Sequence, residues 1–172
     1  YRGYKEGDTF VFEDFTKTPR GFCQGAAAVL FPCLYALTFG AEFQFEGNPR
    51  SIHTTCPDGG KVEFFTQVLT QSGEVEKGEK KEHHGPSPKK MIISVEEVNG
   101  HCAYDYKPGD TIEVTGLRTP QGFCGAAYNA LFPVLFALNM GAKFSFSEDK
   151  NTNLRVTCPD GGIIRFKVRR VQ

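Results

Sequence analysis

Excess charge of either sign is missing from this sequence, because 20 Lys and Arg residues are balanced by 20 Asp and Glu residues. Such a balance gives no electrostatic basis for binding nucleic acid or an anionic membrane surface. The sequence also lacks a phosphate-binding loop, a dinucleotide-binding glycine pattern, a nucleophile elbow and a metalloprotease helix motif. It therefore assigns the chain to no reaction class, and whether the protein is an enzyme stays open.

Cys-x-x-Cys pairs are absent as well, so no two cysteines close in sequence can pre-form a metal or redox site. Six cysteines are nevertheless present: Cys23, Cys33, Cys56, Cys102, Cys124 and Cys158. The composition, 40% hydrophobic with 16 Phe, predicts a packed core, unlike that of a small secreted scaffold stapled by disulfides. We therefore predict reduced thiols and a cytoplasmic protein.

Charged residues are missing from two long stretches, 21–41 and 122–142. Runs of this length can cross a membrane as helices. Each run, however, contains an internal proline (Pro32 or Pro133) and several glycines, and charged, strand-like segments flank it directly. A helix buried against its own sheet explains the same composition, and we predict no membrane association.

The two uncharged runs belong to an internal repeat. Residues 21–43 and 122–144 align without a gap, and 13 of the 23 positions are identical. The match extends upstream to YKEGDTFVF from Tyr4 and YKPGDTIEV from Tyr106, and downstream to two copies of TCPDGG. A period near one hundred residues is too long for a solenoid, so we predict a duplicated domain.

The domain boundaries follow from this alignment. We predict a first repeat over residues 1–70, a charged flexible linker over 71–90 and a second repeat over 91–172. The second repeat opens with the strand-like segment MIISVEEV and then His101-Cys102, and the matching stretch of the first repeat would lie before Tyr1.

A complete repeat is predicted to be a β-β-α-β-β-β unit, which makes the chain an α+β protein of two copies with pseudo-twofold symmetry. Each copy contains one buried helix that its internal proline kinks or splits, a strand carrying a pair of phenylalanines, and a hairpin with a Pro-Asp-Gly-Gly turn. The predicted strands are 91–98, 110–115, those through Phe43/Phe45 and Phe144/Phe146, 52–56, 154–158, 61–68 and 163–171, and the helices are 22–39 and 123–140. Because so small a unit cannot cover its apolar faces alone, we expect pairing of the copies, self-association or a protein partner.

Three cysteines of the second repeat fall at the ends of predicted elements. Cys102 follows the first strand, Cys124 opens the helix and Cys158 precedes the hairpin turn. The first repeat retains the last two as Cys23 and Cys56, and His101 offers a further ligand of the second repeat. Three thiols, with or without the histidine, are the donor set of a zinc site or of an iron–sulfur cluster. We therefore predict a metal site of three cysteines, or of three cysteines and one histidine.

Two other interpretations of these cysteines stay open. A helix N-terminus favours negative charge, so Cys23 and Cys124 should have lowered pKa values, and Cys124 could serve a thiol-dependent enzyme or redox carrier. Alternatively the cysteines are buried as small apolar residues of a structural subunit, as expected for Cys33, whose aligned partner is Val134. The leading interpretation is a non-catalytic binding module that holds its metal or cluster for a redox assembly.

The segments HCAYDYKPGD, TPQGFCGAAYNALFPVLFALNMGAKFSF and RVTCPDGGIIRFKVRR together resemble an uncharacterised family of small cysteine-containing proteins from anaerobic bacteria and archaea. Its pattern is Gly-His-Cys, Lys-x-Gly-Asp, Gly-x-Cys opening an Ala-rich helix, and Cys-Pro-Asp. The resemblance covers residues 91–171 and, in the first repeat, Tyr4 to about Val68. It implies the cytosol of an anaerobe, with Cys102, Cys124 and Cys158 as the family's cysteines and Cys23 and Cys56 as their counterparts. Within residues 1–172 the chain departs from the family by being a tandem and by showing no His-Cys ahead of Tyr4 in the first repeat.

Overall fold

The computed structural model describes residues 3–81, 88–147 and 149–171, and within them the chain is an α+β protein with two helices and two antiparallel sheets. The helices are α1 (Gln24–Thr38) and α2 (Gly125–Asn139). The strands are β1 (Ser51–Thr55), β2 (Glu63–Gln67), β3 (Lys90–Val98), β4 (Thr111–Thr115), β5 (Thr152–Thr157) and β6 (Ile164–Arg170). The predicted α+β class is confirmed.

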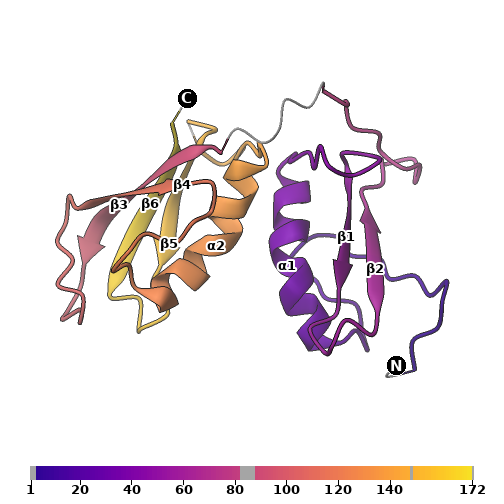
Figure 1. Ribbon diagram of the computed structural model, residues 1–172, viewed down its shortest axis with the longest axis horizontal. Helices are drawn as coiled ribbons and strands as arrows, with labels where there is room; N and C mark the ends of the chain where they lie inside the picture. Colours follow the sequence, from indigo (N-terminus) through magenta and orange to yellow (C-terminus); the bar gives the residue numbers. More distant parts are fainter. Residues whose placement is uncertain (1–2, 82–87, 148, 172) are drawn as a thin grey trace.

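The elements are arranged in layers. Strands β1 and β2 form a two-stranded hairpin, and the other sheet has the order β4-β3-β6-β5. Helix α2 lies against the four-stranded sheet, α1 lies against the hairpin, and the two helices face each other in the middle (Figure 1). Among the described residues, no helix combines the length and apolarity that a membrane crossing requires.

Both helices end where glycine permits a left-handed backbone. Gly40 has φ 78° and Gly141 has φ 88°, and each directly follows the residue that caps its helix. Pro32 and Pro133 lie inside continuous helices of 15 residues each, so neither proline splits its helix in two.

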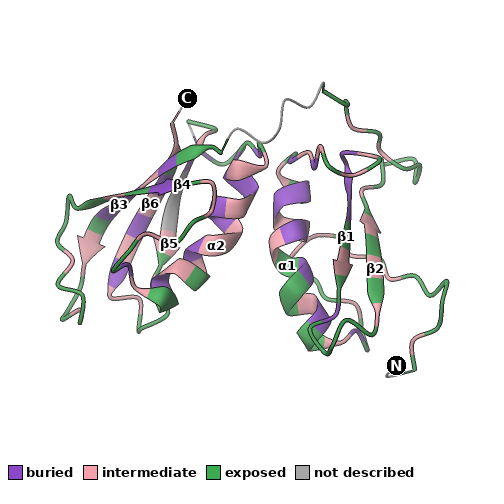
Figure 2. Ribbon diagram, in the orientation of Figure 1, coloured by how far each residue is buried: buried purple, intermediate pink, exposed green. Residues whose placement is uncertain are grey.

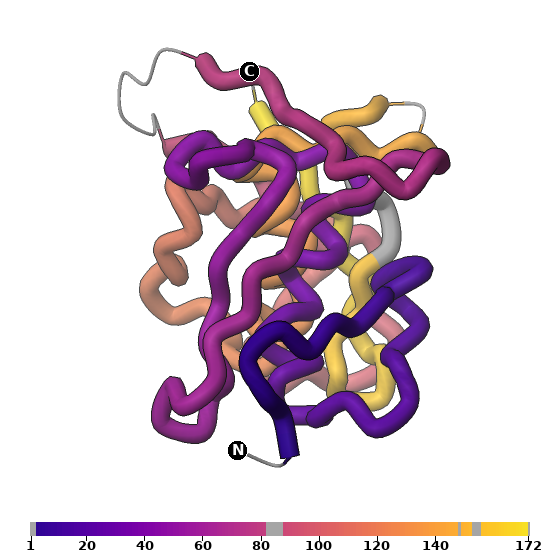
Figure 3. Tube along the Cα trace, turned by 90° about the vertical axis from the view of Figure 1, so that its right-hand side faces the viewer, coloured from indigo at the N-terminus to yellow at the C-terminus, as the bar shows by residue number. Residues whose placement is uncertain are grey.

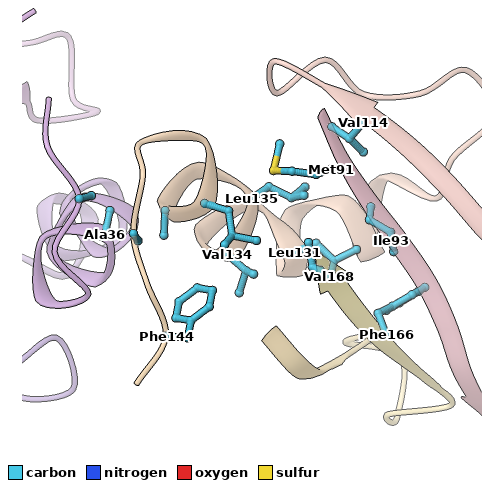
Figure 4. Close-up of a cluster of buried hydrophobic side chains, with 14 of the residues drawn as sticks. Ala36, Met91, Ile93, Val114, Leu131, Val134, Leu135, Phe144, Phe166 and Val168 are labelled. Carbon is cyan, nitrogen blue, oxygen red and sulfur yellow. The ribbon is translucent and has the colours of Figure 1, made fainter. Parts of the chain in front are cut away.

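The main hydrophobic core is shared between the two halves of the chain. Its second-half part is built by the inward side chains of β3 and β6 against α2, and Figures 2 and 4 show this buried layer. Met91, Ile93 and Val95 are at most 1% exposed, and burying side chains of this size stabilises the fold by about 1.5–3 kcal/mol each. The first half contributes residues of α1 and of the loop after it, among them Ala36 and Phe43.

Two backbone hydrogen bonds join the segments that follow the helices. The Glu42 N–H donates to the Met140 carbonyl (3.2 Å), and the Lys143 N–H donates to the Phe39 carbonyl (2.9 Å). In the sequence alignment Glu42 matches Lys143 and Phe39 matches Met140. Each bond is therefore the counterpart of the other: donor matches donor and acceptor matches acceptor, with the two halves exchanged.

The strands predicted through the phenylalanine pairs are not formed. Phe43 and Phe144 are fully buried, whereas Phe45 and Phe146 are 63% and 60% exposed, so the members of a pair do not share a face. The reason is a local turn: the Phe43 N–H donates to the Pro49 carbonyl (2.8 Å) of its own loop rather than to a neighbouring strand. A complete half is accordingly β-β-α-β-β, as in β3-β4-α2-β5-β6, and not β-β-α-β-β-β.

The described part of the first half contains fewer strands than the second. Residues 9–13, which align with β4, are not a strand. In the second half β4 pairs only with β3, and residues 3–81 contain no counterpart of β3 for residues 9–13 to pair with.

The segment after β2 runs back along the first half. The Arg50 guanidinium pairs with the Glu76 carboxylate (2.8 Å), and the Asn48 side-chain amide donates to the Glu76 carbonyl (2.8 Å). Of the predicted linker, 71–90, residues 82–87 lie outside the described residues. The domain boundaries and the flexibility of the linker stay predictions.

Candidate cysteine site

Cys23 is placed by the turn that starts α1. It is the N-cap residue, with φ −66° and ψ 122°, and its own backbone N–H donates to the Tyr4 hydroxyl (2.7 Å). The second half repeats the arrangement, since the Cys124 N–H donates to the Tyr106 hydroxyl (3.2 Å). A tyrosine hydroxyl thus accepts a bond from a backbone N–H that the helix leaves unpaired, and each cysteine side chain lies beside the helix N-terminus.

Cys56 is the first residue after β1, where the hairpin turn begins. Its backbone N–H donates to the Val62 carbonyl (2.8 Å), and the thiol contacts the Asp58 carbonyl (3.9 Å). Burial raises the pKa of this thiol, but the backbone amides of Val62, Asp58 and Lys61, with the Lys61 charge, outweigh that effect and hold the pKa below its ordinary value. The turn itself requires Gly59 and Gly60, whose φ values of 67° and 66° are left-handed.

Cys23 and Cys56 line one pocket of about 660 Å³ at the N-terminus of α1. The first turn of the helix lies next to the hairpin turn, since a Cβ at Gly25 would be in ordinary van der Waals contact with Pro57 Cγ (3.5 Å) and Cys23 Sγ (3.8 Å). Two cysteines that are far apart in sequence thus line the same pocket. Two thiols beside a helix N-terminus can ligate a soft metal ion, or be oxidised together to a disulfide.

Cys158 occupies the same turn in the second half. Its N–H donates to the Ile164 carbonyl (2.9 Å), and the Ile164 N–H donates to its Sγ (3.3 Å). Cys124 and Cys158 both pack, half-buried, against the main core. Each of the two hairpin turns thus places backbone polar groups within hydrogen-bond distance of its cysteine.

Cys102 lies in the loop between β3 and β4 and is also half-buried. Burial raises the pKa of Tyr106; the Cys124 N–H bond lowers it, and the charges of Cys124 and Cys102 raise it further. His101, next to Cys102, is exposed.

All of the predicted ligands, Cys23, Cys56, His101, Cys102, Cys124 and Cys158, are among the described residues. Over residues 3–81, 88–147 and 149–171, the structure contains no group of three or more His, Cys, Asp or Glu side chains arranged to hold a metal ion. In the first half, Cys23 and Cys56 line one pocket. The set of three cysteines, with or without the histidine, stays a prediction.

Cys33 differs from the others in its surroundings. It is 7% exposed on α1 within the main core, and burial raises its pKa to about 11. A thiol of this kind stays protonated and packs as a small apolar residue.

Tyr4 and Tyr106 were not predicted as site residues. Their matching positions in the two YK-x-GDT segments were a signal that could have indicated them. Their role became visible only through the hydrogen bonds to the Cys23 and Cys124 amides.

Comparison of the chain with protein-family models, curated proteins and solved structures gave no match. The resemblance to the small cysteine-containing family, and what it implies, therefore stays a prediction.

Proposed function

We propose that the protein is a non-catalytic binding module whose cysteine thiols hold a thiophilic metal ion, zinc or the iron of an iron–sulfur cluster. The observation that supports this is the pocket shared by Cys23 and Cys56 at the N-terminus of α1. Thiolates select such metals, and the lowered pKa of Cys56 makes its thiolate available. In the second half Cys124 and Cys158 are the equivalent ligands, with Cys102 and His101 in the same half.

The proposal includes a duplicated unit with a pseudo-twofold axis between α1 and α2. Besides the reciprocal backbone bonds, two ring contacts support it: Phe43 with Phe136 (centroids 5.7 Å apart) and Tyr35 with Phe144 (5.9 Å). In the alignment Phe43 matches Phe144 and Tyr35 matches Phe136, so each contact is the counterpart of the other. Reciprocal contacts are the property of a twofold interface. The module would act in the cytoplasm, as part of a redox assembly or with another protein partner.

A cobalt titration of the reduced protein without oxygen tests the thiol ligands, because Co²⁺ takes zinc sites and gives thiolate charge-transfer absorption. We expect this absorption in the wild type and its partial loss in Cys56→Ser and in Cys158→Ser. Cys33→Val is the matched control, since valine is the aligned residue of the other half, and it should bind as the wild type does. Absorption that is unchanged in both serine variants would contradict the proposal.

A second candidate function is a thiol-dependent redox carrier, which the lowered pKa of Cys56 favours. Its thiolate, with Cys23 in the same pocket, would form a disulfide and pass two electrons and two protons to an external disulfide. Cys124 is predicted to act in the same way in the second half. Loss of two free thiols per reacting pocket on incubation with oxidised glutathione, with no cobalt absorption in the reduced protein, would favour this candidate.

A further inference from the structure

The Tyr106 ring is held between the residue that precedes α2 and the four-stranded sheet. Its centroid lies 5.8 Å from that of Phe123, which comes directly before Cys124, and 6.3 Å from that of Phe166 on β6. Phe166 is fully buried and Phe123 is 8% exposed, so both neighbours are fixed by the main core. The tyrosine is itself half-buried, and its hydroxyl accepts the bond from the Cys124 N–H (3.2 Å).

The first half holds Tyr4 in the same way. Its ring lies beside Phe22 (centroids 6.1 Å apart) and Phe64 of β2 (6.2 Å). These two phenylalanines align with the two neighbours of Tyr106. Figure 3 shows the N-terminal segment beside the hairpin of β1 and β2, in agreement with the ring contact to Phe64. The arrangement, with its bond from the Cys23 N–H (2.7 Å), therefore recurs at aligned positions.

A short turn fixes the backbone directly after each tyrosine. The Lys107 N–H donates to the Asp110 carboxylate (2.8 Å), and the Asp110 N–H donates to the Lys107 carbonyl (3.0 Å). The first half forms the same two bonds between Lys5 and Asp8, at 2.8 and 3.1 Å. Aspartate side chains often close turns in this manner. The YK-x-GDT segments thus share a structural role, which is to hold the tyrosine that begins them.

The hydroxyl of each tyrosine still has a proton to donate. A phenolic hydroxyl can accept a hydrogen bond and also donate one. In both halves it accepts from the cysteine N–H, and it forms no second hydrogen bond within residues 3–81, 88–147 and 149–171. Only Cα and Cβ separate that amide nitrogen from the sulfur of the same cysteine. The hydroxyl and the thiol are therefore neighbours.

We propose that Tyr4 and Tyr106 are positioning residues of the cysteine sites, and that each hydroxyl donates a hydrogen bond to the metal-bound thiolate of Cys23 or Cys124. These roles rest on the proposed function, to which they add the residues that orient its ligands. A metal-bound thiolate keeps negative charge on sulfur and accepts such a bond. The bond orients the ligand and withdraws electron density from it, which changes metal affinity and redox potential.

A cobalt titration of Tyr106→Phe tests the second half, because phenylalanine keeps the ring and removes only the hydroxyl. Variant and parent both carry Cys56→Ser, so that the thiolate-to-cobalt absorption reports the second half. We expect Tyr106→Phe to bind Co²⁺ about tenfold more weakly. Its absorption band should also move to longer wavelength, since a sulfur without the hydroxyl bond releases its electrons more easily. Tyr4→Phe in a protein with Cys158→Ser should behave in the same way.

Tyr128→Phe is the matched control. Its hydroxyl belongs to the same half and donates to the Leu117 carbonyl (2.7 Å), so this variant should keep the affinity and the band of the parent. A Tyr106→Phe protein that matches this control in both measurements would overturn the proposal. Weaker binding without a shift of the band would also overturn it, because a general loosening of the fold lowers affinity alone.

The metal-free protein provides a measurement that does not depend on cobalt. With its acceptor removed, the Cys124 amide hydrogen of Tyr106→Phe should exchange with solvent about tenfold faster, a difference of about 1.4 kcal/mol. Tyr128→Phe should leave this rate unchanged. An unchanged rate in Tyr106→Phe would overturn the proposal even where cobalt binds. A wild type without cobalt absorption would refute the proposed function, and the donated bond with it, even where the exchange rates are as expected.

Discussion

Replacing Arg50 with methionine should remove one of the strongest ties between α1 and the segments after it. The Arg50 residue is 8% exposed, and its guanidinium donates to the Ala41 carbonyl (2.7 Å), the Leu37 carbonyl (3.0 Å) and the Glu76 carboxylate (2.8 Å). Leu37 is in the last turn of α1, where helix carbonyls lack an intrahelical partner. One side chain thus satisfies the helix end, the loop after it and the returning segment.

The expected decrease in the free energy of unfolding follows from these three hydrogen bonds. A hydrogen bond from a charged donor contributes about 1.5–3 kcal/mol when its acceptor would otherwise be buried without a partner. The Leu37 carbonyl still accepts a hydrogen bond from the Gly40 N–H (3.0 Å). It is therefore not left without a partner, and losing the Arg50 bond there costs less than the full amount. The Glu76 side chain is 40% exposed, and such a pair contributes about 0–1 kcal/mol. Arg50→Met should therefore lower the free energy of unfolding by about 2–4 kcal/mol.

Urea denaturation followed by circular dichroism measures this loss, with an unchanged m-value indicating an unchanged two-state transition. Arg50→Lys retains the charge but not the three-way geometry, and should lose roughly half as much. Arg20→Met changes an exposed arginine and should cost less than about 0.5 kcal/mol. A loss below about 1 kcal/mol for Arg50→Met would refute the reasoning, because the buried carbonyls would then need no such donor.

Three further predictions concern single side chains. The far-ultraviolet thiolate absorbance that Cys56→Ser removes should titrate below the ordinary thiol pKa, because backbone amides lower the pKa of Cys56; titration at or above that value would contradict this. The Thr152 hydroxyl lowers the pKa of Asp149, so its contribution to stability is present above the unfolded pKa of about 3.9 and is lost as the pH falls through the folded one. Asp149→Asn should therefore flatten the acid side of a stability–pH profile, and an unchanged profile would argue against the effect. Phe144→Ala should cost about 3–5 kcal/mol in urea unfolding, whereas the control Phe146→Ala, at a ring 60% exposed, should cost less than about 1 kcal/mol; equal losses would refute the assigned burial.

Much of the fold follows from local sequence signals. The uncharged runs closed by Gly40 and Gly141 gave helices that begin and end within about two residues of their predicted limits, and Pro-Asp-Gly-Gly correctly predicted both hairpin turns. The Phe43/Phe45 spacing wrongly predicted a strand. The same spacing of two residues also occurs in a turn, and here the backbone forms its hydrogen bond within its own loop. Periodicity reports which side chains alternate, and not which backbone partners are available.

The site was less accessible to prediction because it depends on tertiary pairing. Cys23 and Cys56 were predicted at the ends of elements, and both line one pocket, but whether they act as ligands stays a prediction. The Tyr4 hydroxyl bond to the Cys23 amide and the lowered pKa of Cys56 could not be read in advance, because both depend on distances between separate segments.

The metal content of the protein purified without oxygen tests the central claim most directly. We predict near-stoichiometric zinc or iron per protein chain in the wild type. Cys56→Ser and Cys158→Ser should each lose metal, and Cys33→Val should retain it. Wild-type protein that contains no metal, while the serine variants keep the wild-type circular dichroism spectrum, would contradict the account.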